Sequence, residues 1–176
     1  MEALWTRHRG ARSGWLPAGG DRCNRTRRLV LTLAAAAPLA VGCASKPAPT
    51  TLAGSVVAAS GLNPSVSGRP SPLLLRVYEL KSDTAFNQAD FMSLYQSDQA
   101  ALGAEMVARE EIMLQPGQTR PLARALDAQT RFLGIFAAYR DLEHAVWRAA
   151  VAVQPGRANR LTIRAEPLAV SATAQP

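Results

Sequence analysis

The sequence predicts a mainly β fold, an antiparallel β-sandwich with a small helical insertion after the second strand. Beyond residue 50, short segments of alternating apolar and polar residues recur roughly every ten residues, which is typical of a sandwich. Turn-forming pairs such as Pro116-Gly117 and Pro155-Gly156 separate these segments. Only residues 83–103 change to the apolar spacing of a helix.

Individual strands follow from the period-2 alternation, which places every second side chain on the same face. In residues 73–81, one face carries Leu73, Leu75 and Val77, and the other carries Leu74, Arg76 and Tyr78. Both faces are largely apolar, so we expect this strand to be central in its sheet. The expected strands are residues 51–60, 73–81, 105–114, 118–126, 130–140, 144–153 and 159–165.

Residues 130–140 give the strongest strand signal after that central segment. Phe132 and Phe136 share one face, and Leu133, Ile135 and Ala137 share the other. We predict that the Phe132 and Phe136 face belongs to the core, together with Trp147 of the next strand. In residues 159–165, Leu161, Ile163 and Ala165 are expected to point inward.

The helical insertion and the C-terminal segment complete the chain. In residues 83–103, Phe86, Ala89 and Tyr95 have helical spacing, and Gly103 is expected to end the helix. Asn87 with Asp90 three positions later is similar to a capping box, which predicts a helix start there. Residues 167–176 are rich in Ala, Ser and Thr, and we expect them to form a flexible tail.

A long loop joins the first two expected strands. Residues 61–72 are dense in turn formers, including Asn63-Pro64 and Gly68-Arg69-Pro70. Loops of about a dozen residues are uncommon in compact domains and are often functional.

The N-terminal part predicts a cleaved secretory signal that ends in a lipidated cysteine. Three arginines lie at 25, 27 and 28, an apolar run covers residues 29–41, and Gly42 precedes Cys43. The run carries Thr32 and Pro38 and is shorter than the roughly 20 apolar residues that a spanning helix needs. The sequence Ala40-Val41-Gly42-Cys43 resembles the bacterial lipobox, in which the thiol receives a diacylglycerol. The alternative is an ordinary cysteine that follows a cleaved signal.

The expected organisation therefore has four parts. These are a signal peptide at 1–42, a lipidated tether at 43–50, a sandwich domain at 51–166 and the tail at 167–176. The helical insertion of the sandwich domain covers about 83–103. We interpret the first 21 residues as the result of a mis-assigned start codon.

Charge excludes a nucleic-acid partner. The whole chain has a formal net charge of +7, but 7 of its 20 basic residues precede Cys43. The expected mature chain keeps 13 basic and 11 acidic residues, and these are interleaved. Nucleic-acid binding requires clustered Lys and Arg, which this part of the sequence does not have.

The sequence offers no catalytic or metal site, so we predict that the protein is not an enzyme. The mature chain has one histidine, His144, and we interpret it as a turn residue. Glu110 and Glu111 are adjacent on an expected strand and point to opposite faces, so they cannot act on one bond. Asp141 and Glu143 lie in a turn and are interpreted as solvated. We expect no metal, no small-molecule substrate and no cofactor apart from the covalent lipid on Cys43.

The order of these features resembles a known family. The lipobox and a Pro-rich tether are followed by the 61–72 loop and then by four short segments in a fixed order. These segments are Leu75-Arg76-Val77-Tyr78-Glu79-Leu80, Phe86 with Ala89-Asp90-Phe91, Ala137-Ala138-Tyr139-Arg140-Asp141, and Trp147-Arg148. This set is similar to the TssJ family, the outer-membrane lipoproteins of the bacterial type VI secretion system.

The resemblance implies a fold, a location and a partner. The fold would be a transthyretin-like sandwich, and the lipid would sit in the inner leaflet of the outer membrane, facing the periplasm. The partner would be the periplasmic C-terminal region of TssM, the large inner-membrane protein of the same complex. By this resemblance, the 61–72 loop contributes to that contact through Asn63, Pro64, Gly68, Arg69 and Pro70.

Two other functions stay open at this stage. A β-sandwich lipoprotein can be a periplasmic carrier of a small ligand. It can also be a pilot lipoprotein of a different secretion apparatus.

Overall fold

The computed structural model describes residues 48–176. The signal peptide, Cys43 and the first residues of the tether lie outside the described residues. Within them, no helix is both long enough and apolar enough to cross a membrane.

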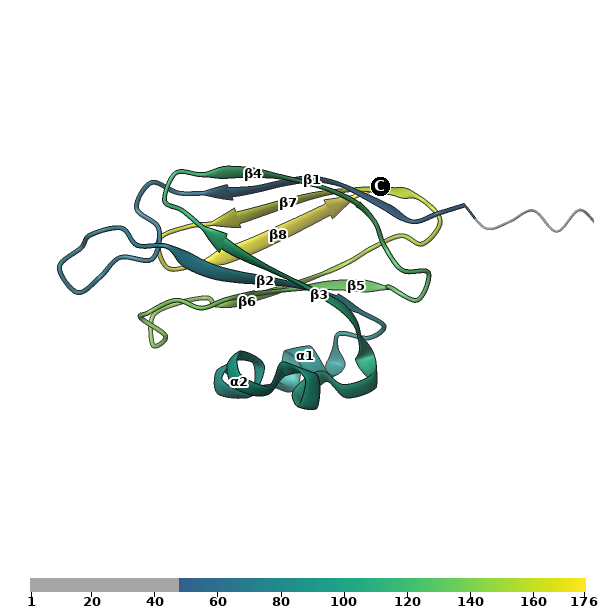
Figure 1. Ribbon diagram of the computed structural model, residues 1–176, viewed down its shortest axis with the longest axis horizontal. Coiled ribbons are helices and arrows are strands. Elements are labelled where there is room, and N and C mark those ends of the chain that lie inside the picture. The colour runs from purple at the N-terminus through teal and green to yellow at the C-terminus, as the bar shows by residue number, and fades with distance from the viewer. Residues whose placement is uncertain (1–47) are drawn as a thin grey trace, which may run out of the picture. The chain divides into compact units, whose positions relative to one another are not determined.

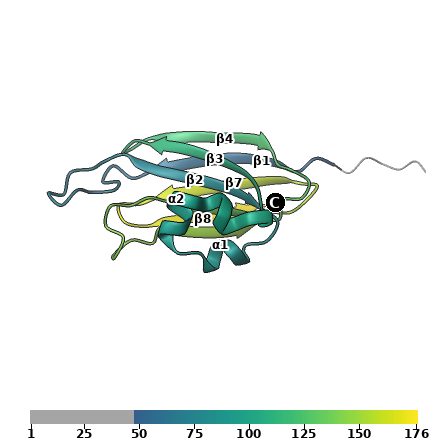
Figure 2. The ribbon, with the colours of Figure 1, turned by 60° about the horizontal axis from the view of Figure 1, so that its bottom comes forward.

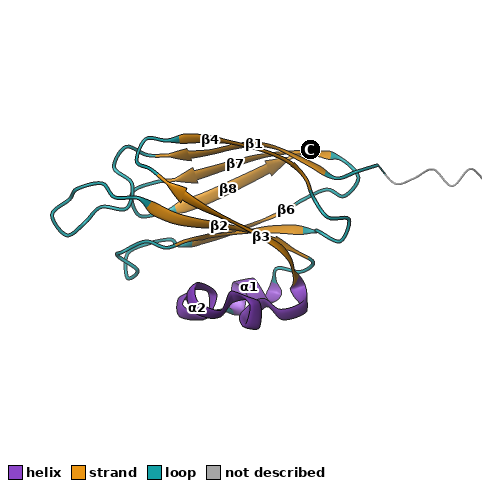
Figure 3. Cartoon of the chain, in the orientation of Figure 1, coloured by secondary structure: helices purple, strands orange, loops and turns teal. Residues whose placement is uncertain are grey.

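Two four-stranded sheets pack face to face, which confirms the predicted sandwich (Figures 1 and 3). The sheet orders are β4-β1-β7-β8 and β3-β2-β5-β6, so β2 is central as predicted. The elements are β1 (Thr51–Ala58), β2 (Leu73–Leu80), α1 (Thr84–Gln88), α2 (Phe91–Leu102), the 3-10 helix η1 (Gly103–Glu105), β3 (Met106–Leu114), β4 (Thr119–Ala125), β5 (Phe132–Ala137), β6 (Arg148–Ala152), β7 (Ala158–Ala165) and β8 (Val170–Gln175).

The pairing is antiparallel except between β1 and β7, which run parallel. This corrects the expectation of a purely antiparallel sandwich. Thr51 pairs with Ala158 and Ala58 with Ala165, so the two partners are separated by more than half of the domain sequence. Alternation within a strand sets its faces but not its neighbour, so the sequence pattern could not show this direction.

The alternation correctly predicted the faces of the strands. Between the sheets, a core forms from the inward residues of both sheets, with Val77, Ile135 and Leu161 fully buried. On the other face of the β3-β2-β5-β6 sheet, Tyr78 and Phe136 pack under the helices (Figure 2). Both side chains are fully buried. The strands that carry them, β2 and β5, are therefore covered on one face by the other sheet and on the other face by the helices.

The helical insertion begins differently from the prediction. Asn87 lies inside α1 and donates to Asp83 at 2.9 Å, whereas Asp90 caps α2 by accepting from the Ser93 N–H at 2.9 Å. Ala89 between them has an extended conformation, which separates the two helices. The capping-box interpretation of Asn87 and Asp90 was therefore wrong, because the Asp90 cap uses Ser93 rather than Asn87.

The C-terminal segment is a strand rather than a flexible tail. Within residues 167–176, β8 pairs antiparallel with the whole second half of β7. Val170 is buried, and Ala172 and Ala174 pack against the core. These small side chains give a weak hydrophobic signal, so the strand depends on its ladder with β7 more than on its own composition.

The strand directions divide the connections between two ends of the sandwich. We call one end the loop end, because it holds the β1–β2, β3–β4, β5–β6 and β7–β8 connections. We call the other the entry end, because the chain enters β1 there from Thr50. In Figure 1, the β1–β2 loop projects at the left and the entry end lies at the right.

Candidate functional site

The loop between β1 and β2 forms a stiff projection at the loop end. Its tip is a tight turn in which the Gly68 N–H donates to the Ser65 carbonyl at 2.7 Å. The Ser65 N–H donates to the Arg69 carbonyl at 2.8 Å, and the Ser65 hydroxyl accepts from the Arg69 N–H at 3.2 Å. Gly68 has a φ of 76°, a conformation that suits glycine and explains the residue at this turn.

Asn63 fixes the base of this loop. Its side-chain amide donates to the Pro72 carbonyl at 2.8 Å, its side-chain oxygen accepts from the Arg140 N–H at 2.9 Å, and its own N–H donates to the Pro167 carbonyl at 3.1 Å. The residue is only 2% exposed and has a positive φ of 47°. Asn63 thus joins three connections of the loop end.

The five predicted contact residues fall into two groups. Asn63 is buried and engaged within the protein, so it can shape a binding surface without forming one. Pro64 is half-buried, and Gly68, Arg69 and Pro70 are exposed on the projection. The structure therefore leaves four of these residues accessible to a partner.

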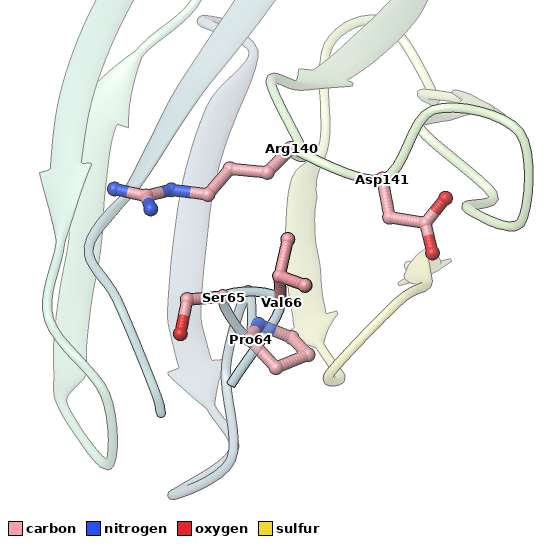
Figure 4. Close-up of a pocket in the computed structure, with 5 residues that line it drawn as sticks. All are labelled: Pro64, Ser65, Val66, Arg140 and Asp141. Carbon is pink, nitrogen blue, oxygen red and sulfur yellow. The ribbon is translucent and has the colours of Figure 1, made fainter. Parts of the chain in front are cut away.

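A groove of about 490 Å³ lies beside the projection, and we call it the distal groove (Figure 4). The β1–β2 loop contributes one wall and the β5–β6 connection the other; the lining residues are Pro64, Ser65, Val66, Arg140 and Asp141. In Figure 4, Val66 lies between Arg140 and Asp141, whose charged groups point in opposite directions. The groove thus combines an apolar centre with one positive and one negative side chain.

Sequence reasoning missed Val66 and the second wall. Val66 is fully exposed at the tip of the turn, and Leu142 and Val146 are exposed apolar residues of the β5–β6 connection. An apolar residue inside a Ser-, Gly- and Pro-rich loop was the available signal for Val66. Nothing local indicates that residues 140–146 lie next to a loop that is more than 70 positions away.

The other polar residues considered in the sequence have structural partners. Glu110 accepts from Arg124 at 2.6 Å and Glu111 from Arg76 at 2.8 Å, so the pair faces two different sides as predicted. His144 is exposed and bonds to Asp141 at 2.8 Å. Residues 48–176 contain no group of three His, Cys, Asp or Glu side chains arranged to hold a metal ion.

Comparison with known proteins identifies the family. Residues 50–168 match the T6SS-SciN family, described as type VI secretion lipoprotein, VasD, EvfM, TssJ. The chain belongs to this family. The match covers β1 to β7 and ends before β8, and it agrees with the resemblance drawn from the sequence. A comparison with curated proteins gave no match.

Solved structures of type VI secretion proteins have the same fold. The T6SS lipoprotein TssJ1 from Pseudomonas aeruginosa is 44% identical, with a TM-score of 0.70, over 73% of this chain and 98% of that chain. Serratia marcescens Lip, a membrane-bound component of the type VI secretion system, is 24% identical, with a TM-score of 0.64, over 70% and 96%. A chain in a structure described as the T6SS protein TssM C-terminal domain from EAEC is 24% identical, with a TM-score of 0.56, over 72% and 98%.

Members of the TssJ family are structural lipoproteins of the type VI secretion system and are not enzymes. The prediction that this chain performs no catalysis is confirmed by its membership. The last two structures, below 25% identity, support the fold alone.

Proposed function

We propose that this TssJ-family lipoprotein tethers TssM to the outer membrane. In this proposal, lipidated Cys43 holds the domain on the periplasmic face of the membrane. The distal groove and the exposed loop residues then bind the periplasmic C-terminal region of TssM.

The observation that carries the proposal is the position of the two ends of the sandwich. The chain enters at one end through Thr50, and the β1–β2 loop projects from the other (Figure 1). The eight residues of β1 separate these ends by about 26 Å at roughly 3.3 Å per residue. An anchor at the entry end therefore leaves the loop end free to reach into the periplasm.

The loop end also has the physical properties of a binding surface. The hydrogen bonds of Ser65, Arg69 and Asn63 hold the projection in one conformation before association, which lowers the entropy cost of binding. Val66 and Arg69 are exposed, and arginine is enriched among the residues that carry most of the binding energy of an interface. The choice of partner follows from what the TssJ resemblance implies, and the chain's membership of that family supports it.

Calorimetric titration of the soluble domain against the TssM periplasmic region tests the proposal. Val66→Asp, Arg69→Ala and a loop shortened within residues 65–68 should each weaken the association, by about tenfold for a residue worth roughly 1.4 kcal/mol. Arg160→Ala is the matched control, because Arg160 is an exposed arginine in the entry half of β7, paired with Ala53.

Thermal midpoints should stay close to wild type in the point variants, because surface changes usually alter stability by less than about 0.5 kcal/mol. Wild-type affinity in all three loop variants would place the TssM contact on another surface.

A further inference from the structure

The chain enters the domain through a residue that is held firmly at the entry end. The Thr50 carbonyl accepts from the Leu126 N–H at 2.9 Å, and its hydroxyl accepts from the Gly156 N–H at 2.9 Å. The next N–H, that of Thr51, donates to the Arg157 carbonyl at 3.0 Å. Thr50 is only 5% exposed. The N-terminal segment therefore leaves from a fixed point between the β4–β5 and β6–β7 connections.

A mostly apolar hollow of about 660 Å³ surrounds this exit, and we call it the basal hollow. Its lining residues are Ala48, Pro49, Thr50, Leu126, Ala128, Arg131, Pro155 and Gly156. Six of the eight are apolar or glycine, and Arg131 is the one charged residue among them.

The charges close to the hollow favour an anionic partner. Arg157 follows Gly156 directly and is exposed, which adds a second cation beside Arg131. The nearest carboxylate in sequence, Asp127, is exposed and accepts from the Gln129 N–H at 2.8 Å, so these two arginines and one carboxylate leave a net positive charge beside the hollow. An apolar surface with cationic side chains at its edge matches the boundary between acyl chains and phosphates in a bilayer.

The length of the preceding chain brings the hollow close to any lipid on Cys43. Ala48 lies five positions after Cys43, and five steps of 3.3–3.6 Å span at most about 18 Å. The headgroup region on each side of a bilayer is roughly 5–8 Å thick. Cys43 would carry its acyl chains at this layer, so the entry end can reach the headgroups.

We propose that the basal hollow is a second, non-covalent membrane contact that seats on the phospholipid headgroups of the bilayer holding the Cys43 lipid. Ala128 and Pro155 face the apolar boundary, and Arg131 and Arg157 contact phosphates. This inference rests on the proposed lipidation of Cys43. Its consequence is orientation, because a seated domain points its distal groove away from the membrane, whereas a domain on a loose tether would not.

Depth-dependent fluorescence quenching tests the seating. Cys43 is the only cysteine of the mature chain, and lipid occupies its thiol, so one added cysteine can be labelled selectively. The lipidated Ala128→Cys protein, carrying an environment-sensitive dye, is placed in phospholipid vesicles that contain headgroup-region spin-labelled lipid. The same dye on Ser67→Cys, at the tip of the distal turn, is the control.

We expect the dye at Ala128 to be quenched several-fold more than the dye at Ser67. Equal and weak quenching at both positions would overturn the proposal and show a domain held away from the bilayer. In vesicles containing anionic lipid, Arg157→Glu should lower quenching at Ala128, whereas Arg164→Glu, the same charge change on the outer face of β7, should not. Unchanged quenching in Arg157→Glu would remove the phosphate contact from the proposal.

The same preparations separate this inference from the lipid anchor itself. If Cys43→Ser releases the protein from vesicles while the Ala128 dye of the lipidated protein stays unquenched, the anchor stands and the seating fails. If Cys43→Ser binds the vesicles as tightly as the lipidated protein, the proposed lipid anchor fails whatever the dye reports, whereas weak residual binding is what the seating alone would give.

Discussion

Single residues join parts of the domain that the sequence keeps far apart. Asn63 bonds to the connections that hold Pro72, Arg140 and Pro167, and its conformation is one that Asn adopts more readily than most residues. Asp98 has a similar role in the helical layer, where it binds side chains from β2 and β3.

Replacing Asn63 should loosen the loop end. Asn63→Ala leaves the Arg140 N–H and the Pro72 carbonyl without their partner, which should lower the free energy of unfolding by about 1–3 kcal/mol. Asn63→Asp keeps an acceptor for Arg140 but places a buried carboxylate against the Pro72 carbonyl, so it should lose at least as much at neutral pH. Urea denaturation measures both variants, and an unchanged midpoint in Asn63→Ala would contradict the role assigned to this side chain.

Asp98 should make stability depend on acidic pH. Burial alone would raise the pKa of Asp98, but hydrogen bonds from Arg109 at 2.6 Å and Tyr78 at 2.9 Å, with the charge of Arg76, hold it below its usual value. An unfolded Asp has a pKa of about 3.9. The stabilisation from the native carboxylate is therefore complete above about pH 4 and is lost as the pH falls through the lowered native pKa.

The comparison of wild type with Asp98→Asn tests this dependence. The difference in their free energies of unfolding should be largest at neutral pH, at about 1–3 kcal/mol, and should shrink below pH 4. Denaturation at pH 7 and pH 3 measures it. A difference that is the same at both pH values would show that the charge of Asp98 does not stabilise the fold.

At the scale of elements, the helical layer packs mainly on β2 and β5, and the edge strand β8 pairs with β7 in its sheet. Phe136 on β5 has its ring centroid 5.0 Å from that of Phe91 in α2 and 5.9 Å from that of Trp147. Trp147 is itself only partly buried and packs against both clusters. On the opposite sheet, β8 has β7 as its ladder partner.

Phe136→Ala should remove the centre of the contact between helices and sheet. Truncation of a large buried aromatic costs about 3–5 kcal/mol, a large share of a typical domain stability of about 5–15 kcal/mol. The urea midpoint should fall sharply. Met92→Ala, at an exposed apolar residue of α2, is the control and should stay near wild type.

A chain that stops after Glu166 should lose far more stability than it would if residues 167–176 were a flexible tail. It lacks the β8 ladder and the buried Val170 side chain, which together should cost about 3 kcal/mol or more. Removal of Pro176 alone is the control. Equal thermal midpoints for the two truncated chains would mean that β8 contributes nothing to the fold.

The whole molecule is arranged between two opposite ends, one for entry of the chain and one for the projecting loop. The proposed tethering depends on this arrangement more than on any single contact. The proposed anchor, Cys43, lies outside the described residues, so it is tested by an experiment in cells.

Cys43→Ser should release the protein from the outer membrane into the periplasm. Each buried methylene contributes about 0.8 kcal/mol and a single chain anchors only marginally, so a diacylglycerol with an amide-linked chain should give stable attachment. Membrane fractionation measures the distribution. Sedimentation of the Cys43→Ser protein with outer membranes would show that lipid is not the anchor.

Ala44→Asp should instead shift the lipoprotein to the inner membrane in enteric-type bacteria, where Asp at this position is the usual retention signal.

The sequence by itself determined the features that depend on neighbouring residues. Alternation placed Leu73, Val77 and Phe136 on their correct faces, and Pro and Gly marked the 61–72 loop. These signals are local, because strand faces have a period of two and turns need only a few residues of a suitable type.

Only the tertiary structure decided which segments meet. Four features each bring together residues that are distant in the chain. They are the parallel pairing of β1 with β7, the pairing of the strand at 170–175, the hydrogen bond between Asn63 and Arg140, and the position of Val66 beside Asp141. Buried amide and carbonyl groups must find partners wherever the fold brings them. For that reason Asn63, one of the predicted contact residues, is buried and bonded to three connections of the loop end.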